Sequence, residues 1–248
     1  MAVAIPVEDG RHFVTVAVPG VDPDKAALQS GDGASSDGAA KVFVDPVSRL
    51  VVFKVEGAAA AGAMSLRSPA PLGAGFSLQG PGGLRGTTLD WVKQVDGKIL
   101  PLALLKVHYG GRPPAPGTPL LDGSGNLVAI AYTAAGESDG YALPAEVAKH
   151  VVEAVIRDGA VAKARLGLTL LPSNAKPQIA RVLVDSPASR AGLQVGDVLS
   201  EIGGRRIGDY ADAVNAFYFL RPASTVSIKL LRAGQPVAVS LTPESGAK

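Results

Sequence analysis

Short runs of alternating apolar and polar residues extend from Arg11 to about Tyr141, and clusters of Gly, Pro and Asp separate them. This alternation, rich in β-branched residues, predicts β-strands joined by turns. The predicted strands are "HFVTVAV", "AKVFV", "LVVFKV", "GFSLQG", "LDWVKQV", "ILPLALLKVHY", "TPLL" and "LVAIAY". We therefore expect a mainly-β domain, a barrel or a sandwich. The upstream stretch "AVAIPV" either supplies its N-terminal strand or leaves it one strand short.

The pattern changes to helical spacing after Leu143. In "PAEVAKHVVEAVIRDG", Val147, Val151 and Val155 recur every four residues, as on one face of a helix. Pro144 suits the first turn and Gly159 suits a left-handed C-terminal cap. His150, in the middle of this helix, is interpreted as a surface or packing residue.

A second unit follows, so we place the domains at 1–160 and 161–248. Its most specific stretch is "DSPASRAGLQVGDVLSEIGG". Ser186 and Pro187 predict the start of a short helix, which Gly192 ends. Leu193 is expected in the core, and Gly196 turns the chain into the strand "VLSEI". Next we expect a helix over "DYADAVNAFYFL", capped by Asp209, and two strands, "TVSIKLLR" and "PVAVSLT".

Composition excludes several classes of function. Of the 248 residues, 47% are hydrophobic and 19% charged, which indicates a folded chain. The net charge of +2 comes from interspersed signs, so we expect no nucleic-acid partner. There is no cysteine, and three histidines without ligand-like spacing predict no metal site; no cofactor motif is present. No apolar run is long enough to span a membrane, and "MAVAIPVEDG" is too short and uncharged for a signal peptide.

The run "SPASRAGLQVGDVL" resembles the signature of bacterial PDZ domains. Placed after a β-rich domain and a connecting helix, it makes the chain resemble the HtrA (DegP-like) family. "RHFVTVAV", "DPVSRLVVFKVEG" and "DGYALPAEV" resemble the family's histidine strand, aspartate strand and the end of its protease domain. The resemblance implies a trypsin-like double β-barrel followed by a PDZ domain, serine endopeptidase ancestry, and a periplasmic or cell-envelope location, with the cytoplasm left open.

The positions that match the family's catalytic triad carry unsuitable residues. Val18 stands where the family has histidine, Arg49 where it has aspartate, and Pro116 where it has the serine nucleophile. Valine takes no proton, arginine has the wrong charge, and proline offers no nucleophile. The two oxyanion N–H groups would belong to Pro114 and Pro116, and proline has none. These residues predict that the protease activity has been lost.

Two other hydroxyl groups, those of Ser124 and Thr118, are candidates for a nucleophile. The "GSG" stretch at Gly123–Gly125 resembles a nucleophile motif, but it falls in a predicted hairpin turn. Thr118 follows the old serine position, and His108 is the nearest histidine along the chain. The sequence offers no recognisable carboxylate to orient that ring. His12 is interpreted as structural.

The PDZ resemblance implies a groove in which a C-terminal peptide adds as a strand. The stretch "ARLGL" resembles the loop that holds the terminal carboxylate, and "GLTLL" the edge strand beside it. One wall of the groove would come from the helix "ADAVNAF", although its apolar residues also suit the core-facing side of an amphipathic helix. The expected peptide-binding residues are Arg165, Leu166, Gly167, Leu168, Thr169, Leu170, Val214 and Phe217.

The leading hypothesis is a non-catalytic HtrA-like protein that binds peptide or protein C-termini and acts as a scaffold or regulator. One alternative is a serine endopeptidase that uses unrecognised residues. Another is a structural assembly subunit, with the groove occupied by its own chain or by a sibling protease. A homo-oligomer is compatible with each of them.

Overall fold

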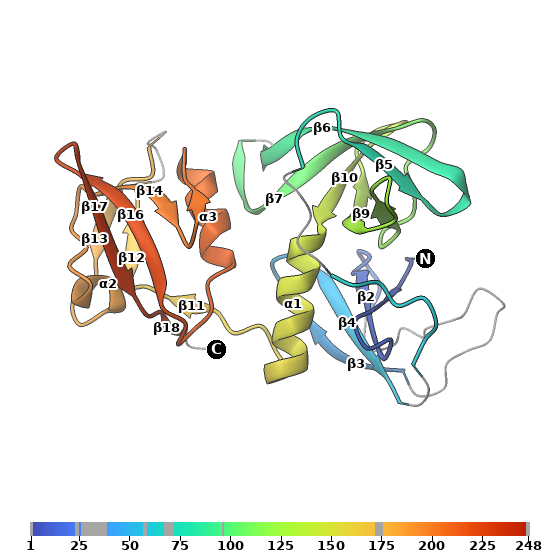
Figure 1. Cartoon of the computed structure of the whole chain (residues 1–248), viewed down its shortest axis with the longest axis horizontal. Helices are drawn as coiled ribbons and strands as arrows, with labels where there is room; N and C mark the ends of the chain where they lie inside the picture. The colour runs from blue at the N-terminus through green and yellow to red at the C-terminus, as the bar shows by residue number, and fades with distance from the viewer. Residues whose placement is uncertain are drawn as a thin grey trace. The chain divides into compact units, whose positions relative to one another are not determined.

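The chain forms two compact units in a computed structural model that describes residues 2–22, 25, 39–56, 59–66, 72–95, 97–171 and 176–246 (Figure 1). Unit 1 comprises Met1–Val92 and Leu104–Val161. Unit 2 comprises Lys93–Ala103 and Ala162–Lys248. Both are rich in antiparallel strands, as the alternating pattern predicts.

Unit 1 begins with a four-stranded antiparallel sheet in the order β1-β2-β4-β3. The stretch "AVAIPV" does supply the first strand. Within the described residues these four strands form one sheet, with β1 and β3 at its edges. The strands are β1 (Ile5–Val7), β2 (His12–Val16), β3 (Ala39–Val44) and β4 (Leu50–Val55).

The next six strands form a closed barrel in the order β10-β7-β6-β5-β8-β9; residues 93–95 of β6 and 98–103 of β7 are grouped with unit 2. Its interior is filled by apolar side chains, among them Leu78, Leu105, Leu120 and the buried ring of Tyr109. The strands are β5 (Ser77–Gly80), β6 (Leu84–Val95), β7 (Lys98–Tyr109), β8 (Pro119–Leu121), β9 (Leu127–Ala134) and β10 (Asp139–Pro144), with the 3₁₀ turn η2 (Pro81–Gly83) between β5 and β6.

Helix α1 (Ala145–Asp158) follows the barrel where the helical spacing predicts it. Pro144 precedes its first turn, and Gly159 caps its end with φ of 73°, donating its N–H to Val155 O. The apolar face, including Val147 and Val151, is buried. His150 is also buried, so it is a packing residue.

Unit 2 is built from three small sheets and two helices around one apolar core (Figure 1). The largest sheet has the order β15-β14-β16-β17; β11 pairs with β18, and β12 pairs with β13. The elements are β11 (Ala164–Arg165), β12 (Leu168–Leu170), β13 (Ile179–Val182), α2 (Pro187–Arg190), β14 (Val198–Ile202), β15 (Arg205–Arg206), α3 (Tyr210–Tyr218), β16 (Val226–Arg232), β17 (Gln235–Leu241) and β18 (Glu244–Ser245).

The "SPASRAGLQVGDVL" stretch folds as its residues predict. Ser186 caps α2 by accepting the Ser189 N–H, and Gly192 ends the turn with φ of 73°. Leu193 enters the core, and the chain then turns at Gly196, with φ of 94°, into β14. Asp209 caps α3 by accepting the Asp212 N–H at 2.8 Å.

Candidate functional site

Arg49 occupies the position that the resemblance assigns to the catalytic aspartate. It lies in a tight turn with φ of 60°, where its N–H reaches Asp45 O at 2.8 Å. Its Nη2 donates to Ala17 O at 2.7 Å, and its guanidinium lies 5.8 Å from the centre of the Tyr132 ring. Ala17 directly precedes Val18, so the arginine at the aspartate position reaches the backbone beside the histidine position.

The loop at the old serine position is held by bonds to other parts of unit 1. Pro116 O accepts the Val3 N–H at 2.8 Å, and Val3 O accepts the Thr15 hydroxyl at 2.6 Å. Gly117, with φ of 88°, donates its N–H to Ala131 O. Ala131 neighbours Tyr132, the ring that Arg49 approaches. These contacts link the backbone near Val18, Arg49 and Pro116, the three positions that the resemblance assigns to a catalytic triad.

Of the other groups, the Thr118 hydroxyl and the His12 ring are hydrogen-bonded to nearby residues. Ser124 is exposed in the β8–β9 turn, as expected, and its N–H donates to Asp122 Oδ1. Thr118 is buried, and its hydroxyl donates to Ala115 O at 2.8 Å. His12 is buried, with its Nδ1 3.0 Å from Asp9 Oδ1, as a structural residue would be.

His108 has a carboxylate partner that the sequence did not reveal. It pairs across β7 and β10 with Asp139, and its Nδ1 lies 2.8 Å from Asp139 Oδ1. This hydrogen bond is the main cause that holds the pKa of the Asp139 carboxyl below its ordinary value. The expectation that no carboxylate orients His108 is therefore wrong. The pair is solvent-accessible on the barrel, and the Thr118 hydroxyl is committed to Ala115.

In unit 2, β12 presents the strand edge that peptide addition requires. Within the described residues it pairs only with β13, so its other edge has no ladder partner. Gly167 precedes it with φ of 77°, a conformation that favours glycine. A Cβ at Gly167 would overlap the Ser186 side chain. The Leu166 and Gly167 N–H groups make no hydrogen bond to another described residue, whereas their carbonyls accept from Ala188 and Leu183.

Most of the expected apolar groove residues lie in or against the core of unit 2, and the expected polar ones are exposed. Leu166 and Leu170 belong to the core of unit 2, and Leu168 and Phe217 pack against that core while remaining partly accessible. Val214, on α3, is half-buried and lies outside this cluster. Arg165 and Thr169 are exposed. The strand thus offers apolar side chains on one face and polar ones on the other.

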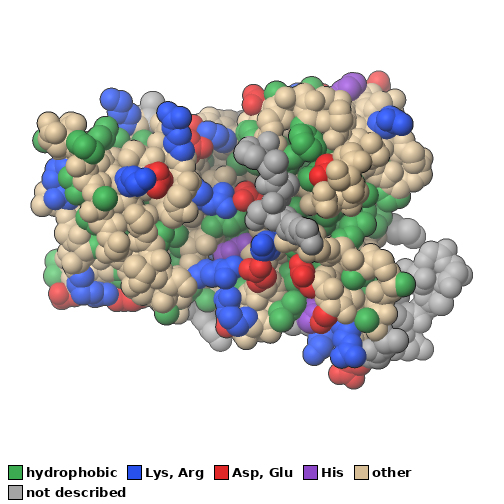
Figure 2. All heavy atoms as spheres, in the orientation of Figure 1, with side chains coloured by type: hydrophobic (Ala, Val, Ile, Leu, Met, Phe, Trp, Pro, Cys, Tyr) green, Lys and Arg blue, Asp and Glu red, His purple; other side chains and the backbone are tan. Residues whose placement is uncertain are grey.

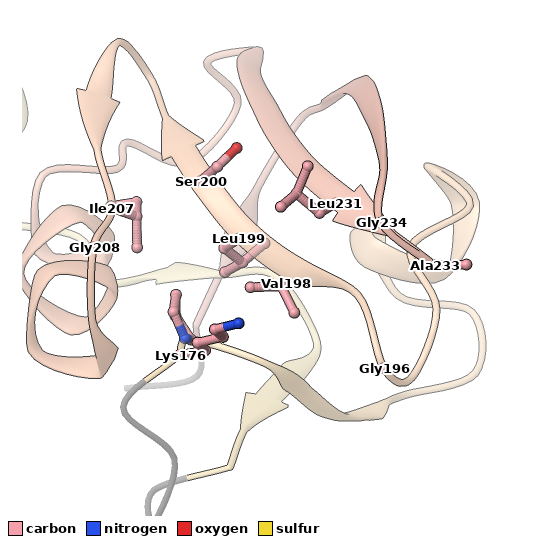
Figure 3. Close-up of a pocket in the computed structure, with 11 residues that line it drawn as sticks. Lys176, Gly196, Val198, Leu199, Ser200, Ile207, Gly208, Leu231, Ala233 and Gly234 are labelled. Atoms are coloured by element: carbon pink, nitrogen blue, oxygen red, sulfur yellow. The ribbon is translucent and has the colours of Figure 1, made fainter.

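A separate apolar hollow lies on the sheet of unit 2. It has a volume of about 400 Å³, and Figure 3 shows Val198 and Leu199 of β14, Leu231 of β16 and Lys176 around it. Val198 and Leu231 are direct cross-strand neighbours. None of the expected groove residues lines this hollow, so it is distinct from the strand edge at β12.

A buried carboxylate braces the turn before β14. Asp197 is only 1% exposed; it accepts from Arg232 Nε and Nη2, both at 2.9 Å, and from the Gln194 N–H. Arg232 Nη2 also donates to Gly192 O at 2.7 Å. The hydrogen bond from Arg232 is the largest cause that holds the pKa of Asp197 below its ordinary value of 3.8. These hydrogen bonds link the "GLQVGD" turn to Arg232 on β16.

Comparisons with known proteins agree with this geometry. The PDZ domain family matches residues 164–242. A probable periplasmic serine endoprotease, DegP-like, from Ectopseudomonas mendocina is 27% identical over 91% of this chain and 53% of its own length. A similarly named protein of Rhizobium meliloti is 32% identical over 50% of this chain and 28% of its own length. Over these stretches the chain is similar to DegP-like proteins.

Solved structures share the fold of this chain. The HtrA-type protease AlgW with tripeptide aligns with a TM-score of 0.70 at 24% identity, covering 99% of this chain and 89% of that one. AlgW with decapeptide aligns with a TM-score of 0.67, covering 99% and 82%. The trypsin-like plus PDZ architecture is thus shown. The chain spans about half or less of the length of the curated relatives above.

Three further observations concern the surface charge, possible metal ligands and membrane-spanning helices. Figure 2 shows Lys and Arg interspersed with Asp and Glu on the viewed face, without a continuous basic stripe. Among the described residues, no cluster of His, Cys, Asp and Glu could hold a metal ion. None of the described helices is long and apolar enough to cross a membrane.

Proposed function

We propose that this HtrA/DegP-like chain binds the C-terminal tails of peptides or proteins at the β12 edge of its PDZ domain. The observation that carries the proposal is the one-sided pairing of β12 beside the Leu166 and Gly167 N–H groups. A peptide added antiparallel to β12 gains main-chain hydrogen bonds, and those N–H groups receive its carboxylate. Arg165, exposed in the preceding strand, adds attraction for the negative charge.

The protease-like unit, in this proposal, acts as a platform and not as a catalyst. Acyl transfer needs a nucleophile, a base and an oriented ring, and Pro116, Val18 and Arg49 supply none of these. The loss of one oxyanion donor costs roughly 3 to 4 kcal/mol in transition-state stabilisation, and Pro114 and Pro116 lack both. The Arg49 and Pro116 backbone contacts further support a structural role for these positions.

The partners and location follow from the relatives. Their names place them in the periplasm as serine endoproteases, so we propose a periplasmic or envelope location and a regulatory or scaffold role. Two of the structural neighbours are described with a bound tripeptide or decapeptide, which supports peptides as ligands here.

The decisive measurement compares free-acid and C-terminally amidated versions of the same peptides in a fluorescence-anisotropy titration of the full chain. Amidation removes the carboxylate without touching the protein, so a loss of binding is expected. Val214→Glu should weaken binding, and Ala238→Glu, the same added carboxylate at an exposed β17 position, should not. Equal binding of acid and amide peptides, or no binding of any tail, would refute the proposal.

The alternative, a serine endopeptidase acting through other residues, remains testable because the relatives carry that activity in their names. A fluorophosphonate probe that forms a covalent adduct with active serine hydrolases should leave the chain unlabelled. Labelling that is lost after heat denaturation, followed by peptide mapping of the modified residue, would support the alternative.

A further inference from the structure

We infer that the β12 groove prefers tails whose penultimate residue is acidic, and that Arg181 on β13 reads this residue. The inference rests on the proposed peptide binding and adds the chemical class of the ligand. Its structural basis is the pairing of Thr169 on β12 with Arg181 on β13, both of which are exposed.

The register of an added strand identifies the peptide position. If the carboxylate is held by the Leu166 and Gly167 N–H groups, the last peptide residue lies opposite Leu168. In an antiparallel strand the penultimate residue then lies opposite Thr169, and the one before it opposite Leu170. Directly opposed residues point to the same face of the sheet. The last and antepenultimate side chains therefore face the apolar side, and the penultimate one faces the side of Thr169 and Arg181.

The distance between these backbone positions allows two long side chains to form an ion pair. Neighbouring strands lie about 4.7 to 4.9 Å apart, so the penultimate residue stands roughly 10 Å from Arg181, measured between backbones. Thr169, the residue between them, is short and carries no charge. An arginine and a glutamate that extend toward each other across this residue can meet, whereas a lysine at the same peptide position would face like charge.

Arg181 has no competing ion pair within the described part of the chain. The other arginines near the loop are differently placed: Arg190 is bonded to Glu244, and Arg165 lies opposite Glu244 on β18. Arg165 sits on the carboxylate side of Gly167, so it adds attraction for every tail whatever its penultimate residue. Arg181 is therefore the cation expected to distinguish one tail from another.

The test uses peptides that are identical except for Glu, Gln or Lys at the penultimate position. The full chain should bind the Glu peptide about two- to five-fold more tightly than the Gln peptide at low salt, and the Lys peptide most weakly. The preference should shrink at high salt because the pair is exposed to solvent. Arg181→Glu should reverse the order. Arg206→Glu, the same charge change at an exposed residue of β15, should retain it.

The outcomes separate this inference from the proposed function. Carboxylate-dependent binding with no penultimate preference, or a preference that Arg181→Glu leaves intact, overturns the inference and leaves tail binding standing. The same holds if Arg206→Glu shifts the preference as much as Arg181→Glu does, because the effect would then reflect net charge alone. If no tail binds in either its acid or its amide form, tail binding and the inference fail together.

Discussion

Replacing Asp197 by Asn should weaken unit 2 more than its small chemical change suggests. The carboxylate accepts two hydrogen bonds from Arg232 and one from the Gln194 N–H, in a nearly solvent-free position. An asparagine keeps one acceptor oxygen and turns an NH₂ group toward a donor. One charge-assisted bond is lost and a guanidinium N–H loses its partner, which costs about 2 to 3 kcal/mol of unfolding free energy.

Amide hydrogen exchange measured by mass spectrometry gives the local readout that this prediction needs. Two compact units need not unfold as one, so a single melting curve would be ambiguous. When opening is fast and reversible, 2 to 3 kcal/mol corresponds to roughly 30- to 150-fold faster exchange in the β14 and β16 segments. Trp91, the only tryptophan of the chain, lies in unit 1 and reports its unfolding separately.

A matched control and a pH series sharpen the test. Glu201→Gln removes the exposed pair with Lys229 on the same two strands and should cost less than about 1 kcal/mol. Because the pKa of Asp197 is lowered in the folded chain, its contribution is fully present above its ordinary value of 3.8 and is lost as pH falls through the lower folded value. The difference between wild type and variant should therefore shrink in acid. Equal exchange in wild type and Asp197→Asn at pH 7 would refute the reasoning.

Two glycine substitutions test the loops of the candidate sites. Gly117→Ala places a Cβ onto Val3 O at a φ of 88°, so the unfolding free energy of unit 1 should fall by about 2 kcal/mol or more. A urea titration followed by Trp91 fluorescence measures this loss. Gly123→Ala, with open space around it, should be nearly neutral. Gly167→Ala meets Ser186 and should destabilise unit 2 by about 1 to 3 kcal/mol beyond Gly204→Ala, which has a similar φ of 82° without the overlap. Equal amide exchange in the unit 2 segments of the two unit 2 variants would contradict the overlap.

Much of the fold could be predicted because its signals are local. The cap at Ser186, the left-handed Gly159 and the alternation of the barrel strands each depend on a few adjacent residues, and the structure confirms them. The pairing order of the first sheet, β1-β2-β4-β3, could not be read in this way. Which strands pair depends on contacts between distant segments, on which the alternation of side chains carries no information.

The pairings that define the candidate sites lie beyond local sequence patterns. His108 and Asp139 are 31 residues apart and meet only through the β7–β10 register. Thr169 and Arg181 are likewise brought together by strand pairing, with a bulge that no sequence motif announces. A search for opposite charges at matched positions of predicted neighbouring strands could have suggested the first pair, once the barrel order was known.

The two candidate sites differ in what would be required to alter them. At the positions that the resemblance assigns to the triad, the residues make backbone hydrogen bonds: Arg49 Nη2 donates to Ala17 O, and Pro116 O accepts the Val3 N–H. Placing His, Asp and Ser at Val18, Arg49 and Pro116 would remove the Arg49 bond and still leave Pro114 without an N–H. Such a variant should remain some 10²- to 10³-fold below one that also carries Pro114→Gly. At β12, by contrast, the proposed acceptor for a tail is an edge of backbone, which substitutions of side chains do not remove.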